Sequence, residues 1–368
     1  MKRRWLVMLV LLAALAAAAW LGFGAGAGSR EAVAYSPRVA NTPPLRGVMS
    51  PPRDMTGEDM EVLAGWNVTL VRFQIMRNWL QRDTDRDLQE YDSWFNSRLD
   101  NLEAMLPLAK RLGIRMVVDF HTPPGGRADG NSMRMFDEEE YAAHFVAVWK
   151  RIAERFKNNP DREAIWAYDL LNEPIESPEA AKRGAADALL LRAAQAIRAV
   201  DPDMPLAVPS LYGGGPDTFR ILRPMPLENV IYEAHMYLPF VYTHQLALPE
   251  TTPPGGEFVE YPGFIEGEMW TKSRLRTALQ PVRDFQLRHG ARIYIGEFST
   301  IVWAPGGGAW LGDCISLFEE YGWDWSYHSF REWDGFSIEH EGAPPDRFWP
   351  APDNPRMRVF LNALRATK

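Results

Sequence analysis

The sequence predicts an α/β fold, a (β/α)8 (TIM) barrel that forms a single domain. Three observations lead to this prediction. Short apolar segments of strand type alternate along the chain with longer amphipathic segments of helix type. Eight such strands, each followed by a crossover, are the number that closes a barrel of this kind. No glycine-rich turn follows the first strand, which disfavours the alternative α/β fold, a doubly wound sheet.

Composition restricts the function of the chain before any motif is considered. With 368 residues, of which 46% are hydrophobic and 24% charged, the chain can bury a large core. The net charge of −8 leaves no basic field, so we expect no nucleic-acid partner. The single cysteine excludes an intrachain disulfide and a cysteine-based zinc cage. The 14 tryptophans fit either core packing or flat aromatic faces of the type that bind sugars.

The N-terminus has the pattern of an export segment. Residues 2–4 are basic, residues 5–29 carry no charge, and residues 25–27 match a small-x-small cleavage site. The apolar run is also long enough for a membrane anchor, so we expect either a cleaved signal peptide or a retained anchor. In both cases the protein is secreted or periplasmic. Residues 30–43 read as a linker, and residues 44–368 as the single barrel domain.

The eight strand candidates are short and rich in apolar residues. They lie at 46–50, 68–73, 115–121, 164–171, 205–210, 229–235, 292–298 and 323–329.

Helical segments separate most of these strands. In one of them, Leu99, Leu102, Leu106 and Ala109 recur at helical spacing. The helix after the fifth strand has the weakest pattern. The predicted helices cover 56–64, 97–112, 138–156, 178–200, 216–222, 270–288, 308–321 and 354–366.

Polar side chains lie where six of the eight predicted strands end. In a barrel of this kind the active site lies at the carboxyl ends of the strands. Strand alternation places Ile293, Ile295 and Glu297 on one face, and likewise Ile231, His235 and Tyr237. The polar residues at these ends are Arg72, His121, Asn172, Glu173, His235, Tyr237, Glu297 and Trp333.

Two glutamates on strands at opposite sides of a barrel suggest cleavage of a glycosidic bond. This reaction needs a proton donor for the leaving oxygen and an anion for the oxocarbenium-like carbon. Glu173 and Glu297 can fill both roles if their surroundings separate their pKa values. Arg72 is the natural cation to keep one of them ionised. Asp119 shares a strand face with His121 and is expected to orient a neighbour.

The motifs LNEP at 171–174, HMY at 235–237 and GEF at 296–298 resemble glycoside hydrolase family 5, the cellulase family. The resemblance covers residues 44–340. It implies a retaining β-glycoside hydrolase, an endo-β-1,4-glucanase in particular, with Glu173 as acid/base and Glu297 as nucleophile.

The resemblance also implies roles for the other polar residues at the strand ends. Asn172 would bind the 2-hydroxyl of the sugar, and Trp333 would form the aromatic floor of the subsite. Arg72 and Tyr237 would hold the nucleophile, and His121 and His235 would line the subsite.

Several alternatives remain at this point. Within the family, a β-mannanase or a β-1,3-glucanase fits the same motifs. Outside it stand a metal-dependent barrel enzyme using His121, His235 and the two glutamates, and a non-catalytic sugar-binding barrel. We expect no cofactor, no bound metal, a β-glucan as partner, and a monomer. Asp83, Asp85 and Asp87 imitate the start of a calcium loop, but Leu88 and Trp94 stand where that loop needs Gly and Glu.

Overall fold

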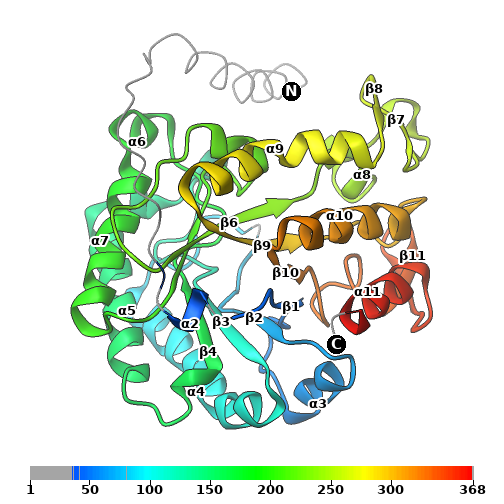
Figure 1. Cartoon of the computed structure of the whole chain (residues 1–368). Coiled ribbons are helices and arrows are strands. Elements are labelled where there is room, and N and C mark those ends of the chain that lie inside the picture. Colours follow the sequence, from blue (N-terminus) through cyan, green and yellow to red (C-terminus); the bar gives the residue numbers. More distant parts are fainter. Residues whose placement is uncertain (1–34, 36, 41, 80, 367–368) are drawn as a thin grey trace. The chain divides into compact units, whose positions relative to one another are not determined.

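Eight parallel strands close into a barrel, with helices around it (Figure 1). The order around the barrel is β1-β10-β9-β6-β5-β4-β3-β2. The strands are β1 (Arg46–Met49), β2 (Leu70–Gln74), β3 (Arg115–Asp119), β4 (Ile165–Asp169), β5 (Leu206–Pro209), β6 (Val230–Met236), β9 (Arg292–Phe298) and β10 (Asp324–Tyr327). Each lies within or beside one of the segments predicted as a strand, so the predicted fold is confirmed.

This computed structural model describes residues 35, 37–40, 42–79 and 81–366. The predicted signal peptide or membrane anchor lies outside the described residues. Within them, no helix combines the length and the apolar character needed to cross a membrane.

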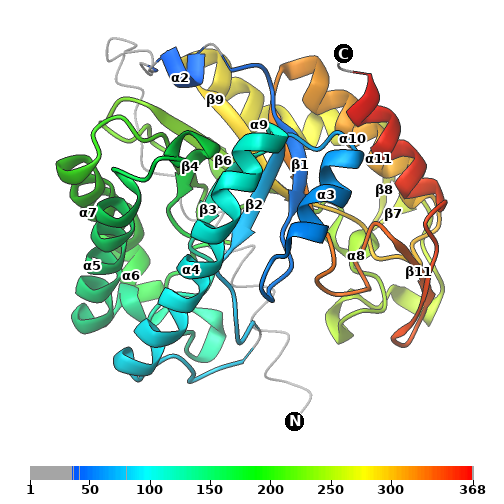
Figure 2. The same cartoon turned by 90° about the horizontal axis from the view of Figure 1, so that it is seen from below.

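The major helices follow the predicted positions, with two informative differences. They are α3 (Gly57–Gly65), α4 (Leu88–Leu112), α5 (Glu139–Phe156), α6 (Pro178–Arg183), α7 (Ala185–Val200), α9 (Lys272–His289), α10 (Gly307–Tyr321) and α11 (Pro355–Arg365). The helix predicted over 97–112 begins at Leu88, because Asp87 caps it by accepting from two backbone N–H groups. The helix predicted over 178–200 is divided at Gly184, whose φ of +63° ends α6. Figures 1 and 2 show α5 and α7 side by side, and likewise α10 and α11.

Shorter elements fill the connections. They are α2 (Pro37–Ala40), α8 (Phe240–Thr243) and the 3-10 helices at Asp129–Asn131, Arg134–Phe136, Arg162–Ala164, Pro216–Arg220, Pro249–Thr251 and Pro254–Gly256. The helix predicted at 216–222 is therefore a single 3-10 helix.

Two antiparallel hairpins were not predicted. One pairs β7 (Gly263–Ile265) with β8 (Glu268–Trp270), and the other pairs β11 (His340–Ala343) with β12 (Arg347–Pro350). Strands of three or four residues alternate too few times to give a recognisable pattern. Trp270, predicted to begin a helix, is instead the last residue of β8, and α9 begins at Lys272.

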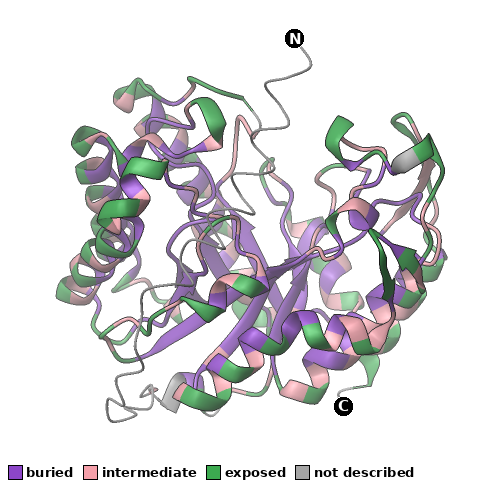
Figure 3. Cartoon of the chain, turned by 90° about the horizontal axis from the view of Figure 1, so that it is seen from above, coloured by how far each residue is buried: buried purple, intermediate pink, exposed green. Residues whose placement is uncertain are grey.

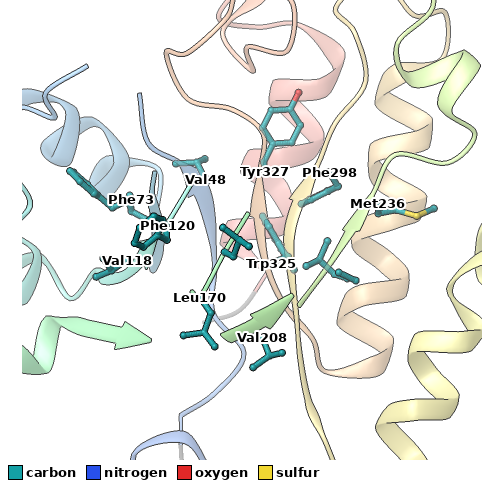
Figure 4. Close-up of a cluster of buried hydrophobic side chains, with 14 of the residues drawn as sticks. Val48, Phe73, Val118, Phe120, Leu170, Val208, Met236, Phe298, Trp325 and Tyr327 are labelled. Atoms are coloured by element: carbon teal, nitrogen blue, oxygen red, sulfur yellow. The ribbon is translucent and has the colours of Figure 1, made fainter. Parts of the chain in front are cut away.

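The hydrophobic core has two layers. The larger layer lies between the strands and the helices, where Figure 4 shows Phe73, Val118, Phe120 and Met236 among its members. The smaller layer includes Leu70, Val117, Trp166 and Tyr294. Figure 3 shows the barrel strands buried, whereas the surrounding helices carry buried, intermediate and exposed residues.

A β-bulge in β9 decides which way Glu297 points. Ile293 and Ile295 belong to the larger, outer layer between the strands and the helices, while Tyr294 belongs to the smaller, inner layer. The register with β6 shifts by one residue after Ile295, so Gly296 is the extra residue and Glu297 turns toward the barrel centre. The prediction that Ile293, Ile295 and Glu297 share one face is wrong, because strict alternation fails at a bulge.

Part of the segment predicted as a linker packs against the amino-terminal end of the barrel strands. Val39 is fully buried in the inner layer. The guanidinium of Arg292, the first residue of β9, donates to the carbonyls of Val39 and Thr42, the latter at 2.8 Å. The hydroxyl of Tyr35 accepts from the backbone N–H of Arg292. These residues therefore belong structurally to the barrel domain.

Candidate active site

The predicted polar residues, except Trp333, converge at the carboxyl ends of the barrel strands. Arg72 lies in β2, His121 follows β3, and Asn172 and Glu173 follow β4. His235 and Tyr237 lie at the end of β6, and Glu297 lies near the end of β9. Arg72 and His235 lie at alternating, inward-facing positions of β2 and β6, whereas the bulge at Gly296 turns Glu297 inward.

Arg72 is the hub of the site and has no exposed surface. Its Nη1 donates to Oε1 of Glu297 at 2.7 Å, and its Nη2 donates to Oδ1 of Asn172 at 3.1 Å. Its Nε donates to Oδ2 of Asp169 at 2.9 Å. Because the Arg72 guanidinium donates to both Glu297 and Asn172, it fixes the positions of these two side chains.

Three further buried carboxylates lie close to the Arg72 guanidinium. The Nη2 atom lies 2.8 Å from Asp169, 3.1 Å from Glu233 and 3.3 Å from Asp119. Burial acts to lower the pKa of Arg72, but these carboxylates outweigh it and raise the pKa. Burial and the neighbouring Glu233 raise the pKa of Asp169 well above its usual value. The hub is therefore held by more carboxylates than its own charge can balance.

Both carboxylate oxygens of Glu297 accept hydrogen bonds. Oε1 accepts from Arg72, and Oε2 accepts from the Tyr237 hydroxyl at 2.8 Å. Nδ1 atoms of His235 and His328 lie 3.6 and 3.8 Å from Oε2. Burial acts to raise the pKa of Glu297. The positive charges of His235, His328 and Arg72 outweigh burial and hold this pKa below its usual value.

Glu173 lies beside the same histidine but in a more open position. Its Oε1 lies 2.9 Å from Nδ1 of His235, and its side chain is 19% exposed. Its φ of +44° is unusual for a residue with a side chain and carries backbone strain of about 1–3 kcal/mol. One oxygen of Glu173, one oxygen of Glu297 and one nitrogen of His235 all lie within 4.8 Å of one another.

His121 and Asn172 form a second line of contacts. Nδ1 of His121 lies 2.8 Å from Oδ2 of Asp119, and its Nε2 lies 3.1 Å from Nδ2 of Asn172. The prediction that Asp119 orients a neighbour agrees with this contact. The Trp79 ring meets the His121 ring edge-on, with centroids 5.0 Å apart. The amide of Asn172 is thus fixed between Arg72 and His121.

Comparison with known proteins gives this arrangement its family. The sequence model of the Cellulase (glycosyl hydrolase family 5) family matches residues 37–330. The chain belongs to glycosyl hydrolase family 5. It is an enzyme of the glycoside hydrolase class, as the sequence predicted.

Individual relatives agree with this family 5 assignment. Endoglucanase C of Acetivibrio thermocellus is 28% identical over 314 residues, which cover 79% of this chain and 88% of the relative. Cellodextrinase A of Ruminococcus flavefaciens is 23% identical over 281 residues, covering 75% and 78%. Cel5A of Thermotoga maritima in complex with mannotriose has the same fold, with a TM-score of 0.64 and 23% identity over 89% of this chain and 100% of that one.

Trp333 stands apart from the other predicted residues of this family 5 site. It follows β10 in the chain and is 37% exposed. Its ring contacts Phe336 and Phe348, with centroids 5.2 and 6.0 Å away, and Phe336 in turn contacts His328. Among the described contacts, one ring separates Trp333 from the residues around Glu297. Its role as a subsite floor stays a prediction.

Four residues near the two glutamates escaped the sequence analysis. Glu233 lies two residues before His235 in β6, so strand alternation could have identified it. Asp169 ends β4 three residues before Asn172, and alternation does not mark it. His328 and Glu332 lie in the connection after β10, where no strand pattern marks which side chains turn inward. Nε2 of His328 lies 3.0 Å from Oε2 of Glu332, and its Nδ1 is hydrogen-bonded to the Tyr237 hydroxyl.

Proposed function

We propose that this enzyme is a retaining endo-β-1,4-glucanase, with Glu297 as nucleophile and Glu173 as acid/base. The observation that carries the proposal is the short distance between the two carboxyl groups, whose nearest oxygens lie within 4.8 Å. Retaining glycosidases hold this pair at about 5–5.5 Å, whereas inverting enzymes need about 6.5–9.5 Å to admit a water. The endoglucanases among the relatives support a glucan as substrate.

The first step forms a covalent glycosyl-enzyme. An oxygen of Glu297 attacks the anomeric carbon while the bond from that carbon to the glycosidic oxygen breaks. Glu173 transfers its proton to the leaving oxygen. The contacts of Glu297 with Arg72 and Tyr237 favour its ionised form, which is the form that attacks.

The second step releases the sugar. Glu173, now ionised, takes a proton from a water molecule, and the water oxygen attacks the same anomeric carbon. The bond to Glu297 breaks, and both glutamates return to their starting protonation. The partial exposure of Glu173 supports its role, because the residue must meet both the leaving group and water.

The remaining predicted residues act on the sugar or on the glutamates. Asn172, fixed by Arg72 and His121, is positioned to bind the 2-hydroxyl of the sugar being cleaved. His121 and His235 line the same subsite. We propose Trp333 as the aromatic floor of this subsite.

The roles are tested by replacing each glutamate with alanine and adding azide. Glu173→Ala should lose about 10²–10⁴-fold on polysaccharide but keep much of its first-step rate on a dinitrophenyl cellobioside, whose leaving group needs no proton. Azide should then restore turnover and yield a β-glycosyl azide. Glu297→Ala should be inactive on both substrates, and azide should yield the α-glycosyl azide.

The matched control is Glu320→Ala, which removes an exposed glutamate of α10 that pairs with Arg276 of α9. Its rates should equal those of the wild-type enzyme. An α-azide from the Glu173 variant together with a β-azide from the Glu297 variant would reverse the roles. Full activity in both variants would place the chemistry elsewhere.

The alternatives within the family differ in the sugar. We propose that soluble β-1,4-glucan is cleaved faster than β-mannan or β-1,3-glucan, and that crystalline cellulose is a poor substrate. Reducing-sugar release from these four substrates decides the order. The mannotriose complex of the Thermotoga maritima enzyme makes mannan the first competitor to measure. A higher rate on mannan would make this enzyme a β-mannanase.

A metal-dependent reaction remains the second candidate, because Glu173, His235 and Glu297 offer three donor atoms within 4.8 Å. His235 does not suit this role well. Burial lowers its pKa, but Glu297 and Glu173 outweigh burial and raise it, so a metal would have to displace a proton from the imidazole. Treatment with EDTA should leave the rate unchanged. A loss that zinc or manganese restores would favour the metal reaction.

We also propose that the enzyme is exported through residues 1–29 and acts as a monomer outside the cytoplasm. The basic and apolar pattern of that segment supports export. N-terminal sequencing of the exported protein separates a cleaved signal from a retained anchor, and light scattering gives the oligomeric state.

A further inference from the structure

His328 and Glu332 lie next to the nucleophile but have no place in the mechanism so far. His328 follows β10, and its side chain is 14% exposed. Nδ1 faces the Tyr237 hydroxyl, and Nε2 lies 3.0 Å from Oε2 of Glu332. The same Glu332 oxygen accepts from Nε2 of Gln74 at 3.0 Å. These contacts form a continuous line from Gln74 in β2 to Glu297 in β9.

The protons in this line can be counted from the geometry. The phenol of Tyr237 has one proton, and it lies within hydrogen-bond distance of both Glu297 and His328. If this proton goes to Glu297, the Tyr237 oxygen must accept from Nδ1 of His328. An ionised Glu332 can only accept, so Nε2 of His328 must also carry a proton. Both ring nitrogens are then protonated, and His328 is an imidazolium.

A neutral His328 would reverse the direction of the Tyr237 hydrogen bond. Its one proton would stay on Nε2, facing Glu332, and Nδ1 would become an acceptor. The Tyr237 proton would then be drawn to Nδ1 and away from Glu297. Glu297 would lose a hydrogen-bond donor and also the positive charge 3.8 Å from its Oε2.

We infer that Glu332 and His328 are positioning residues for the nucleophile: Glu332 holds His328 in its doubly protonated form, so that the Tyr237 proton is directed to Glu297. This inference rests on the proposed role of Glu297. It explains why the Glu332 carboxylate, only 12% exposed, lies beside the site without contacting either glutamate of the proposed catalytic pair.

The electrostatics of the surroundings agree with this arrangement. Burial acts to lower the pKa of His328, but Glu332 and Glu297 outweigh it and raise the pKa. Burial acts to raise the pKa of Glu332, but His328 outweighs it and lowers the pKa. The groups that face His328 are Glu332 in its own connection, His235 and Tyr237 from β6, Glu297 from β9 and His244 after α8.

The test is the pH dependence of kcat/KM, whose acid limb follows the ionisation of the nucleophile in the free enzyme. Glu332→Gln removes the negative charge that keeps His328 protonated. Glu297 then loses a nearby cation and a donor, so its pKa rises. The acid limb should move upward by about one pH unit, as expected for the loss of an opposite charge at this distance.

Two further variants separate this effect from a loss of structure. Glu332→Asp keeps the charge, so its acid limb should stay near that of the wild-type enzyme. Glu339→Gln removes a carboxylate from the same connection, where it pairs with Arg331 at 3.1 Å, and should leave the pH profile unchanged. Thermal unfolding followed by circular dichroism verifies that all three variants fold.

Covalent labelling distinguishes a failure of this inference from a failure of the proposed function. A 2-deoxy-2-fluoro cellobioside with a dinitrophenolate leaving group should label Glu297, as read by mass spectrometry of peptides. Labelling of another residue would overturn the proposed function. Labelling of Glu297 together with an unmoved acid limb in Glu332→Gln would overturn the positioning role alone, as would an equal shift in Glu339→Gln.

Discussion

At the scale of single residues, the site depends on positions where an ordinary rule of strand structure is broken. Glu173 adopts a positive φ, and Gly296 occupies a bulge that turns Glu297 inward. Gly296 leaves no room for a side chain, since a Cβ atom there would lie 1.7 Å from Oε1 of Glu233. Glu233 in turn lies 3.1 Å from Arg72 and 3.4 Å from His235. A small change at Gly296 is therefore transmitted through Glu233 to Arg72 and His235, which contact Glu297 and Glu173.

Gly296→Ala tests this dependence. The added methyl group must displace the Glu233 carboxylate, so we expect a loss of about 1–3 kcal/mol in the free energy of unfolding. We also expect at least a tenfold loss of kcat/KM. Gly65→Ala in α3 is the control, because a Cβ atom there meets nothing within 4 Å. Denaturant titration and a glucan assay measure both effects. Wild-type values for Gly296→Ala would show that Glu233 relaxes freely.

At the scale of elements, the three aspartates before α4, at positions 83, 85 and 87, each make a different structural contact. Asp87 caps α4, with its Oδ1 accepting from the N–H groups of Gln89 and Glu90 at 3.0 and 3.1 Å. Asp85 accepts from Nε of Arg77 at 2.6 Å, and Asp83 pairs with Arg134. Each aspartate thus has its own protein partner, in line with the rejection of a calcium loop at this position.

Asp87→Ala should lower the free energy of unfolding by about 1 kcal/mol, because the first turn of α4 loses its cap. Asp87→Asn keeps an oxygen acceptor and should lose much less. Thermal unfolding compares the two variants with the wild-type protein, and the same measurement with and without calcium tests whether the wild-type protein binds this ion. A melting temperature of the wild-type protein that rises on adding calcium would contradict the assignment of these aspartates to structural contacts.

At the scale of the whole molecule, the two ends of the barrel differ in the side chains that they carry. The carboxyl end collects the charged side chains of the proposed active site, whereas the amino end is closed by apolar packing. Val39 belongs to that apolar layer, and Arg292 ties the preceding segment to β9. The guanidinium of Arg292 also lies over the Trp166 ring, 5.3 Å from its centroid. We therefore expect a change at the amino end to alter stability without altering the reaction.

Val39→Ala should therefore cost about 2 kcal/mol of stability and leave kcat/KM unchanged, because it removes buried methyl groups far from the strand ends that carry the reaction. Ala40→Ser, at the exposed neighbouring position, is the control. Chemical denaturation and the glucan assay provide the two readouts. Equal stability of the two variants would mean that Val39 does not help to close the barrel.

The sequence by itself determined the barrel, the order of its strands and the predicted residues at their ends. Apolar segments of regular spacing report which residues are buried, and parallel strands bring their carboxyl ends together whatever the details of packing. Asn172, Glu173 and Glu297 could therefore be proposed as site residues from local motifs alone.

Only the tertiary structure decided the direction of Glu297, the buried carboxylates around Arg72 and the line from Glu332 to Tyr237. A bulge changes the register through pairing with another strand, which local alternation does not encode. Glu332 and Gln74 are separated by 258 positions in sequence yet lie 3.0 Å apart. Such contacts form because closure of the barrel sets β10 next to β1, and β1 next to β2, and no pattern within either segment contains that distance.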